Sequence, residues 1–507
     1  MLHIRSVFLF TLRWLDLNMK RYSPILFFVI TKCFATINIT SSAEKISSND
    51  SEIDLITLPN FEVAYDTTDS RRFKYGHKFN VQLSIDNSGT WETSNEGVDI
   101  WRLAIESINA YALKIQFNEI SLPENSKLFI YNESRDMIYG PYTSTNINRS
   151  SFSSPLIKGD KVIIEYIQSN FVNKEVRLNI NSIIHDYTDI FNFYNESRDR
   201  NCGENVVCDN AEDFRDQANS IIYMVINQYT CSASLINNVN NDNIPYVLTA
   251  WHCIVGETDL DEHNDFIYYF NHESPTCEGN IGSFEYSISG STLLATRNEN
   301  VGSDFALLVM DESPPEEWNP FYAGWSNDES APLISVGIHH PEDYPRKINY
   351  DNDYAYSCAW TTPNTHWCLS WDDGGTASGS SGSPLFNSNK QIIGTNTGSD
   401  GPDCSAGPDL YGKFSLSWDG GNNSTKRLKD WLDPDDTGVI AINGIYTNPE
   451  TILGDINSDE IVNIIDILLL LDIILDIDVF NQLADINFDN DIDIFDLIQL
   501  IDLILNS

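Results

Sequence analysis

The chain has 507 residues, of which 41% are apolar, and this is enough for two or three packed domains. Its 74 acidic and 30 basic residues give a formal net charge of −44, which repels phosphate backbones and disfavours nucleic acid as a partner. These values exclude a chain that is disordered throughout, and they favour an exported protein with an acidic surface.

The first 35 residues are predicted to be a signal peptide. A basic stretch at residues 19–21 precedes an apolar run at 25–30, and a small-residue cleavage site follows at 33–35. Met19 is an alternative start, with the residues before it as an extension. No other stretch is long and apolar enough to span a membrane. The mature protein is therefore expected to be secreted, and to be extracellular or associated with a cell surface.

Residues 36–200 contain no cysteine after the signal and alternate short β-rich runs with turn signals. The clearest runs are VQLSIDNSG at 81–89, KLFIYNES at 127–134 and KVIIEYI at 161–167. This pattern predicts a small β-rich domain that ends near residue 200.

Residues 201–447 carry all eight cysteines of the mature chain, from Cys202 to Cys404. An even number of cysteines in an exported protein indicates disulfide bonds. Zinc is a weaker alternative, because there are no C-x-x-C pairs and the HHPED stretch lacks the i, i+4 histidine spacing of a zinc helix. Its histidines, His339 and His340, are therefore expected to have a structural or surface role.

The same module contains short apolar runs separated by Asn, Gly and Ser clusters, which predict an all-β barrel or sandwich. These runs are SIIYMVIN, PYVLTAW, DFALLVM and QIIGTN. A helical signal appears only late, at TKRLKDWLD, just before Pro434.

The stretch TASGSSGSPLF at 376–386 is either a flexible linker or a backbone cradle around a reactive hydroxyl. The module supplies residues for the second interpretation: His252 in VLTAWHC, Asp304 in GSDFALLVM and Ser381 in GSSGSP. Each has a structural explanation alone, as a histidine beside a disulfide, a strand cap or a turn residue. Together they match the base, carboxylate and nucleophile of acyl transfer.

From Cys202 to about Gly444 the chain resembles a lysyl endopeptidase, a secreted bacterial member of the trypsin-like serine proteases. The stretches that carry the resemblance are NCGENVVC, TCSASLINN, LTAWHC, GSDFALLVM, FYAGW, GIHHP, GSSGSPLF, DLYGKF and KDWLDPDDTG. It implies a trypsin-like double β-barrel with His252 as general base, Asp304 as its orienting carboxylate, Ser381 as nucleophile and no cofactor for catalysis. The oxyanion donors would be the N–H groups of Gly379 and Ser381. The implied disulfides are Cys202–Cys404, Cys208–Cys277, Cys231–Cys253 and a local pair, Cys358–Cys368.

The resemblance also implies a specificity pocket. Asp409 in DLYGKF takes the place of the carboxylate that selects Lys, or Lys and Arg, before the cut; the alternative is a solvated loop residue. Trp360 is a candidate substrate-binding residue, but Thr397 stands where the family has a histidine stacked on that tryptophan. Ser380 replaces the aspartate that pairs with a new N-terminus in many trypsin-like enzymes, so activation should not depend on such an ion pair.

Residues 36–200 resemble the propeptide of the same enzymes, through VDIWRLAIES and IYGPYTS. No Lys lies between Lys174 and Lys347. Self-cleavage near residue 200 would therefore have to use Arg198 or Arg200, unless another protease cuts there.

Residues 448–507 contain two copies of an acidic loop followed by an apolar helix, GDINSDEIVNIIDILLLLDIIL and ADINFDNDIDIFDLIQLIDLIL. Oxygens at loop positions 1, 3, 5, 9 and 12, with a backbone carbonyl at position 7, suit Ca²⁺. The expected ligands are Asp455, Asn457, Asp459, Ile461, Asn463 and Asp466 in the first copy, and Asp485, Asn487, Asp489, Asp491, Asp493 and Asp496 in the second.

The repeat pair resembles a dockerin, which implies calcium binding and a cohesin-type partner. It departs from that pattern at Glu460 and Asn490, where a loop glycine is usual. Apolar residues also occupy the usual recognition positions. The alternative is a plain amphipathic helix pair with solvated acids.

The whole chain is thus predicted to be mainly β, with a β-rich propeptide, a trypsin-like catalytic domain and a small α-helical tail. The predicted function is a secreted serine endopeptidase that acts on protein or peptide substrates. Two alternatives use the same module: a catalytically silent trypsin-fold binding protein, and an esterase with the same triad.

Overall fold

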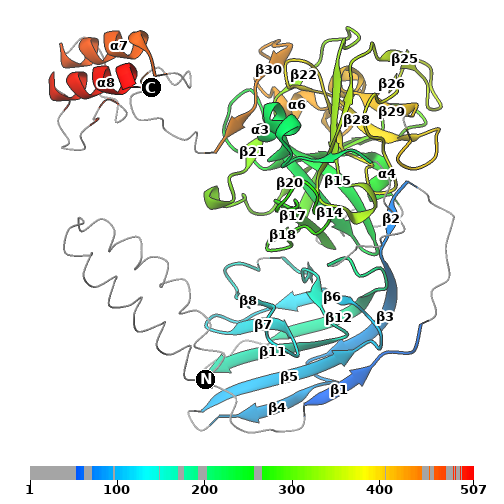
Figure 1. Ribbon diagram of the computed structural model, residues 1–507. Helices are drawn as coiled ribbons and strands as arrows, with labels where there is room; N and C mark the ends of the chain where they lie inside the picture. The colour runs from blue at the N-terminus through cyan, green and yellow to red at the C-terminus, as the bar shows by residue number, and fades with distance from the viewer. Residues whose placement is uncertain are drawn as a thin grey trace, which may run out of the picture.

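The structure is a computed structural model, and the residues it describes are 53–61, 71–94, 97–147, 149–169, 176–191, 202–255, 265–405, 407–447, 456, 462–475, 484, 486, 492 and 494–506. The predicted signal peptide and the boundary at Arg198 and Arg200 lie outside these residues. Strands make up most of the regular structure, so the described part of the chain is mainly β (Figure 1). Among the described helices, none is long and apolar enough to cross a membrane.

The N-terminal sandwich, residues 53–191, consists of a six-stranded and a five-stranded sheet. The first has the order β1-β5-β11-β7-β8, with β4 also paired to β5, and the second the order β10-β6-β12-β3, with β9 paired to β6. The strands of the first are β1 (Asp54–Thr57), β4 (Thr90–Thr93), β5 (Val98–Glu106), β7 (Lys127–Asn132), β8 (Ile138–Tyr142) and β11 (Lys161–Ser169). Those of the second are β3 (Gly76–Ser84), β6 (Ala112–Ser121), β9 (Phe152–Ser153), β10 (Ile157–Lys158) and β12 (Arg177–Asp186).

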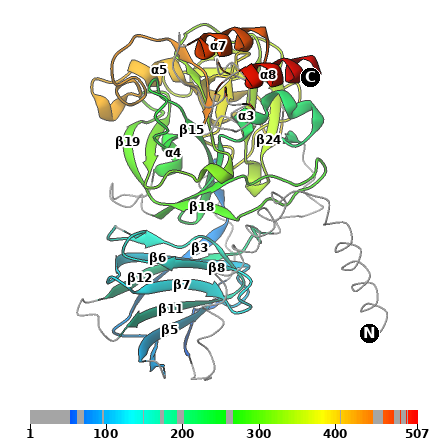
Figure 2. The ribbon, with the colours of Figure 1, turned by 90° about the vertical axis from the view of Figure 1, so that its left-hand side faces the viewer.

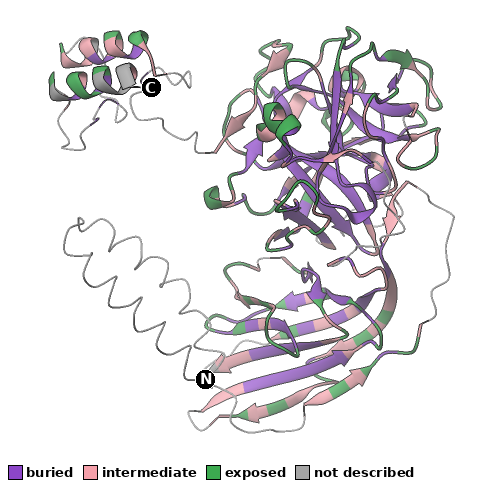
Figure 3. Cartoon of the chain, viewed as in Figure 1, coloured by how far each residue is buried: buried purple, intermediate pink, exposed green. Residues whose placement is uncertain are grey.

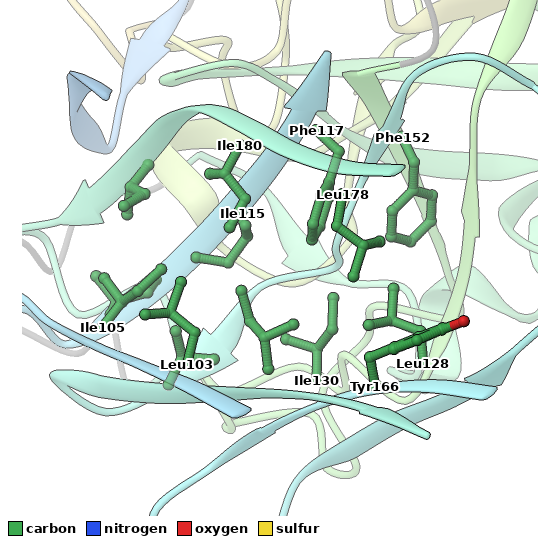
Figure 4. Packing of buried hydrophobic residues seen from close by; sticks show 14 of the residues in the cluster. Leu103, Ile105, Ile115, Phe117, Leu128, Ile130, Phe152, Tyr166, Leu178 and Ile180 are labelled. Atoms are coloured by element: carbon green, nitrogen blue, oxygen red, sulfur yellow. The ribbon is translucent and has the colours of Figure 1, made fainter. Parts of the chain in front are cut away.

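Alternate side chains of the two sheets meet in one core (Figure 4). Leu103 and Ile105 of β5 face this core because side chains on a strand alternate between its faces. On β12 the core positions change from even to odd numbers, Leu178 and Ile180 and then Ile183. A register shift between Ile180 and Ser182 explains the change, since a bulge inserts one extra residue.

The cysteine-bearing module, residues 202–447, forms seven strands of an eight-stranded sheet, whose eighth strand is β2 from the N-terminal region, and a ten-stranded sheet. Their main paths are β18-β17-β14-β15-β16-β20-β19 and β13-β24-β23-β27-β28-β29-β26-β25. The first sheet comprises β2 (Phe73–Lys74), β14 (Ile221–Ile226), β15 (Tyr229–Ile236), β16 (Tyr246–Thr249), β17 (Phe266–Phe270), β18 (Tyr286–Ser289), β19 (Ser291–Arg297) and β20 (Phe305–Met310). The second comprises β13 (Glu204–Asn205), β22 (Trp325–Ser326), β23 (Ser335–His339), β24 (Lys347–Asp351), β25 (Tyr356–Cys358), β26 (His366–Leu369), β27 (Pro384–Phe386), β28 (Ile392–Ser399), β29 (Asp409–Lys413) and β30 (Ala441–Ile442). A separate pair consists of β21 (Phe321–Tyr322) and β31 (Ile445–Tyr446).

Helices in this module are short. The α-helices are α3 (Arg215–Ala218), α4 (Trp251–Ile254), α5 (Phe414–Asp419) and α6 (Lys429–Leu432). The 3₁₀ helices are η4 (Asp209–Phe214), η6 (Glu316–Trp318), η7 (Pro341–Asp343) and η8 (Ser424–Lys426). The predicted late helix is therefore present only as the short α6 with η8, and three short α-helices that the sequence did not predict precede it.

The sandwich packs on the eight-stranded sheet, and this explains why β14 and β17 are buried along their whole length (Figures 2 and 3). On one face of β14, Ile222 and Met224 belong to the core of the module. On the other face, Tyr223 and Val225 pack with residues of the sandwich, including Ile184 of β12. A strand with two buried faces needs a continuous apolar run, which is the pattern of SIIYMVIN.

The C-terminal helices are α7 (Ile464–Ile474) and α8 (Ile494–Asn506), which share a small apolar cluster around Leu470 and Leu500. In each repeat a buried aspartate closes the loop before the helix. The N–H of Ile456 donates to Asp466 Oδ1 (2.8 Å), and the N–H of Ile486 donates to Asp496 Oδ1 (2.9 Å). The two copies are therefore built alike at the described positions.

Candidate active site

His252 and Asp304 lie beside the ends of two paired strands, β16 and β20. His252 lies on α4, directly after β16, and Asp304 immediately precedes β20, which pairs with β16. His252 Nδ1 lies 2.7 Å from Asp304 Oδ2, and the His252 backbone N–H donates to Asp304 Oδ1 at 3.0 Å. Because a carboxylate only accepts, Nδ1 carries the proton and Nε2 is left as a base. Among the described residues this Nε2 is buried and has no hydrogen-bond partner.

The charge state of the pair follows from its surroundings. Burial alone would raise the pKa of the Asp304 carboxyl, but the His252 charge and the hydrogen bonds from His252 hold that pKa below its ordinary value. Asp304 therefore stays ionised, so it fixes the imidazole tautomer and favours the imidazolium that forms when Nε2 takes up a proton.

The stretch 376–386 is largely buried and runs from a turn into β27, so it is not a flexible linker. Ser381 is 2% exposed, and its carbonyl accepts the N–H of Ser232 on β15 at 2.8 Å. Gly382 has φ +85°, and a Cβ there would stand 2.1 Å from Thr249 Oγ1. Only glycine fits this position, which presses the turn against the strand that leads to His252.

The Ser381 hydroxyl and the Gly379 N–H both point at one carbonyl, that of Arg71. Gly379 N donates to Arg71 O at 2.9 Å, and Ser381 Oγ donates to the same oxygen at 3.1 Å. Thus His252 and Asp304 are in contact, whereas Ser381 hydrogen-bonds this backbone carbonyl and not the His252 ring.

Ser380 takes part in a buried hydrogen-bonded bridge. His339 Nε2 lies 3.1 Å from the Cys202 carbonyl and must donate to it, so the neutral ring accepts at Nδ1 from the Ser380 hydroxyl, 2.6 Å away. Ser380 Oγ in turn accepts the N–H of Ala377 at 3.0 Å. Burial lowers the pKa of His339 to about 4, which keeps the ring neutral. His339 and His340 are both fully buried, so the structural role is confirmed and the surface alternative is wrong.

Asp409 is fully buried at the start of β29 and is not a solvated loop residue. Its Oδ2 accepts from Trp371 Nε1 (2.5 Å) and from the N–H of Thr376 (3.2 Å). Its Oδ1 is buried and has no hydrogen-bond partner among the described residues. Burial raises the pKa of this carboxyl, although hydrogen bonds from Ser399, Trp371 and Thr376 act in the opposite direction. A buried carboxylate oxygen without a hydrogen-bond donor is costly for the fold.

Trp360 lies near the side chains of Arg71 and His366. The Arg71 guanidinium carbon stands 5.7 Å from the centre of its ring, and the His366 ring centre is 6.4 Å away. His366 Nε2 is 3.1 Å from Thr397 Oγ1. A histidine therefore does lie beside this tryptophan, but it comes from β26, where the sequence gave no signal for it.

Four disulfides join the module, and they are the pairs that the resemblance implied. They are Cys202–Cys404, Cys208–Cys277, Cys231–Cys253 and Cys358–Cys368. Cys231–Cys253 ties α4 to β15, so it fixes the helix turn that carries His252.

Of the expected calcium ligands, only Asn463, Asp466 and Asp496 fall within the described residues. Asp466 Oδ2 also accepts the N–H of Asn463 (2.8 Å), and Asn463 caps α7. The other expected ligands, Asp455, Asn457, Asp459, Ile461, Asp485, Asn487, Asp489, Asp491 and Asp493, lie outside the described residues. Among the residues that the structure describes, no group of three or more His, Cys, Asp or Glu side chains could hold a metal ion.

Comparisons with known proteins agree with a protease. Residues 195–412 match the family model "Lysyl endopeptidase, C-terminal domain". Lysyl endopeptidase from Pseudomonas aeruginosa is 22% identical over 321 residues, 58% of this chain and 67% of that protein. These sequence matches support a distant relationship to serine proteases, and more narrowly to the lysyl endopeptidases.

Solved structures give weaker similarities. That of Deg5 is 17% identical, with a TM-score of 0.28, over 41% of this chain and 89% of that one. That of the thermostable serine protease AL20 is 15% identical, with a TM-score of 0.28, over 39% and 92%.

Proposed function

We propose that residues 201–447 are a secreted serine endopeptidase of the trypsin-like double β-barrel class, made as a precursor with residues 36–200 as propeptide. The observation that carries the proposal is the buried His252–Asp304 pair, with the free Nε2 of His252, together with the tight turn that holds Ser381 and Gly379 against one carbonyl oxygen. The match of residues 195–412 to the lysyl endopeptidase domain supports it.

In the proposed mechanism, His252 Nε2 removes the Ser381 proton as Oγ attacks the substrate carbonyl carbon. The N–H groups of Gly379 and Ser381 stabilise the oxyanion, and Asp304 stabilises the imidazolium. The imidazolium then protonates the leaving amine, which gives an ester between Ser381 and the acyl half. Water, activated by the same Nε2, hydrolyses this ester and restores the hydroxyl.

The proposed specificity is for Lys, or for Lys and Arg, before the cut. Support comes from Asp409, whose Oδ1 is buried and has no partner among the described residues. A substrate ammonium or guanidinium would pair with this oxygen, whereas a neutral side chain would leave it unpaired. Trp360 would lie along the bound side chain.

For residues 448–507 we propose a dockerin-like, calcium-dependent anchor for a cohesin-type partner. The oxygen donors at the expected positions fit a hard cation such as Ca²⁺. The matching contacts of Asp466 and Asp496 with the N–H groups ten residues earlier support two equivalent loops. When bound, the cation would neutralise loops that otherwise concentrate negative charge.

The experiment is labelling of the wild-type protein and the Ser381→Ala variant with a fluorophosphonate, combined with hydrolysis of Lys-amide and simple ester substrates. We expect labelling of the wild type at Ser381 and a loss of turnover on the order of 10⁶ in the variant. Full activity of a folded Ser381→Ala protein refutes the triad. Hydrolysis of esters without amides would make the protein an esterase, and absence of labelling and of turnover would make it a binding protein.

A further inference from the structure

The short strand β2 adds a segment of the N-terminal region to the sheet that carries the active site (Figure 1). It pairs antiparallel with the start of β15, with Phe73 opposite Thr230 and Lys74 opposite Tyr229. The N–H of Tyr75 then donates to the Gln228 carbonyl at 3.1 Å. Addition of an extended segment to a strand is a common way for a protein to bind a peptide.

The residue two positions before this pairing is Arg71, and its backbone enters the candidate active site. Its carbonyl oxygen accepts the Gly379 N–H at 2.9 Å and lies 3.1 Å from Ser381 Oγ. Donors aimed at a substrate oxygen are expected at 2.7–3.1 Å in such sites. The Arg71 carbonyl therefore lies against the proposed nucleophile and against one of the two proposed oxyanion donors, and the peptide bond that follows this carbonyl is Arg71–Arg72.

The side chain before this bond lies against the strands of the proposed specificity pocket. Arg71 Cδ is 3.6 Å from the position of a Cβ on Gly398 of β28, and Gly398 pairs with Leu410, the residue after Asp409. Arg71 Nη1 stands 3.6 Å from Glu299 Oε1. A basic side chain before the bond is thus placed among aromatic and acidic groups.

The side chain after the bond is also held. Arg72 Nη1 donates to the Val255 carbonyl at 3.0 Å, just beyond the helix that carries His252. Its guanidinium carbon lies 4.1 Å from the centre of the Tyr229 ring. The side chains on both sides of the Arg71–Arg72 bond are thus held by contacts, as the side chains of a bound substrate are.

Contacts between the N-terminal sandwich and Asn227 hold the segment around Arg71 and Arg72 in position. The Tyr75 hydroxyl donates to the Asn227 carbonyl (2.7 Å), and Lys78 Nζ and Gln116 Nε2 contact Asn227 Oδ1 at 3.2 and 2.6 Å. Around them lies the apolar cluster shared by the two units, which includes Tyr75 and Tyr223. The segment is therefore positioned by a buried interface.

We propose that the Arg71–Arg72 bond is an internal substrate, which blocks the cleft in the precursor and is then cut there by the same chain. The inference rests on the proposed function. The Ser381 oxygen forms an ester with the Arg71 carbonyl carbon as the bond to the Arg72 nitrogen breaks, and His252 carries the Ser381 proton to that nitrogen. Water then hydrolyses the ester, leaving a carboxylate on Arg71 and a new N-terminus at Arg72.

The experiment follows purified full-length protein by intact mass and N-terminal sequencing. We expect wild-type protein to form the new terminus at Arg72 at a rate that is unchanged by tenfold dilution, because the reaction is intramolecular. Arg71→Gln should slow this cut up to about fivefold, since the pairing of Arg71 with Glu299 and its contact with the Trp360 ring are lost. The matched control is Arg177→Gln, an exposed arginine of the sandwich paired with Glu119, which should be cut as fast as wild type.

External substrates separate the two proposals. If the protein hydrolyses an added Lys- or Arg-amide peptide while its own Arg71–Arg72 bond stays intact, the inference is wrong and the proposed function stands. The same conclusion follows if folded Arg71→Gln is cut at this bond as fast as wild type. If wild type neither reacts with the fluorophosphonate nor cuts any peptide bond, the proposed function fails and the inference fails with it.

Discussion

Replacement of Asp409 by Asn tests the specificity pocket at its buried charge. Asn keeps one oxygen to accept from Trp371 and Thr376, but it removes the negative charge of the unpaired Oδ1. An ion pair about 4 Å apart at an effective dielectric constant of about 20 contributes roughly 4 kcal/mol. Loss of most of this energy should lower kcat/KM for Lys or Arg substrates by about 10² to 10³.

The assay compares matched amide substrates that differ only in charge, with Lys against norleucine and Arg against citrulline before the scissile bond. The ratio of the two kcat/KM values removes effects on the triad, and Asp409→Asn should bring it close to one. Because burial raises the pKa of Asp409, the wild-type ratio should fall as the pH is lowered and the carboxyl becomes protonated. The ratio in the variant should not change with pH.

Stability provides the control for misfolding. The raised pKa means that the fold disfavours the charged form, so Asp409→Asn should have a Tm equal to or higher than that of wild type. Asp403→Asn, a nearby exposed acid, should leave the ratio unchanged. A folded Asp409→Asn protein that still prefers Lys to norleucine would refute the assignment of the pocket.

Three further outcomes are expected. Gly382→Ala should abolish activity, because its Cβ would overlap Thr249 Oγ1. Gly438→Ala is the control: this glycine also has positive φ (+74°) but has open space around it, so the variant should stay active and lose only about 1 kcal/mol of stability. Equal activity of the two variants would contradict the role of the turn around Ser381. The pKa of His339 is about 4 in the folded protein and 6.5 in the unfolded chain. Folding stability should therefore fall by up to about 3 kcal/mol as the pH drops from 6.5 to 4. Thermal denaturation of His339→Gln should show a smaller loss of stability over the same pH range. Removal of calcium with a chelator should make the tail beyond residue 450 sensitive to proteolysis while peptidase activity persists; unchanged sensitivity would argue against calcium sites.

Much of the fold could be predicted because its strands have local signals. SIIYMVIN, PYVLTAW and DFALLVM contain β14, β16 and β20, QIIGTN covers the first five residues of β28, and the run at 161–167 lies in β11. These short sequence runs do not predict which surfaces of the two domains pack together. The second buried face of β14 exists only because the sandwich packs there.

The candidate site divides in the same way. His252, Asp304 and Ser381 stood in recognisable short motifs, and the structure brings the first two into contact. Arg71 gave no signal, because its role depends on a contact with Ser381 across 310 residues of sequence. The bridge through His339 was missed for a similar reason, since it requires the chain near Cys202 to reach the turn before the nucleophile.

The pairing of β2 with β15 makes the blocking segment a tethered ligand of its own cleft. A short tether of this kind corresponds to an effective concentration of the order of millimolar. A dissolved peptide would have to compete with that concentration, so the precursor should be nearly silent toward dilute substrates without any distortion of its catalytic groups. The low activity of the precursor would then result from competition, and it would end when the residues up to Arg71 leave the cleft after the cut.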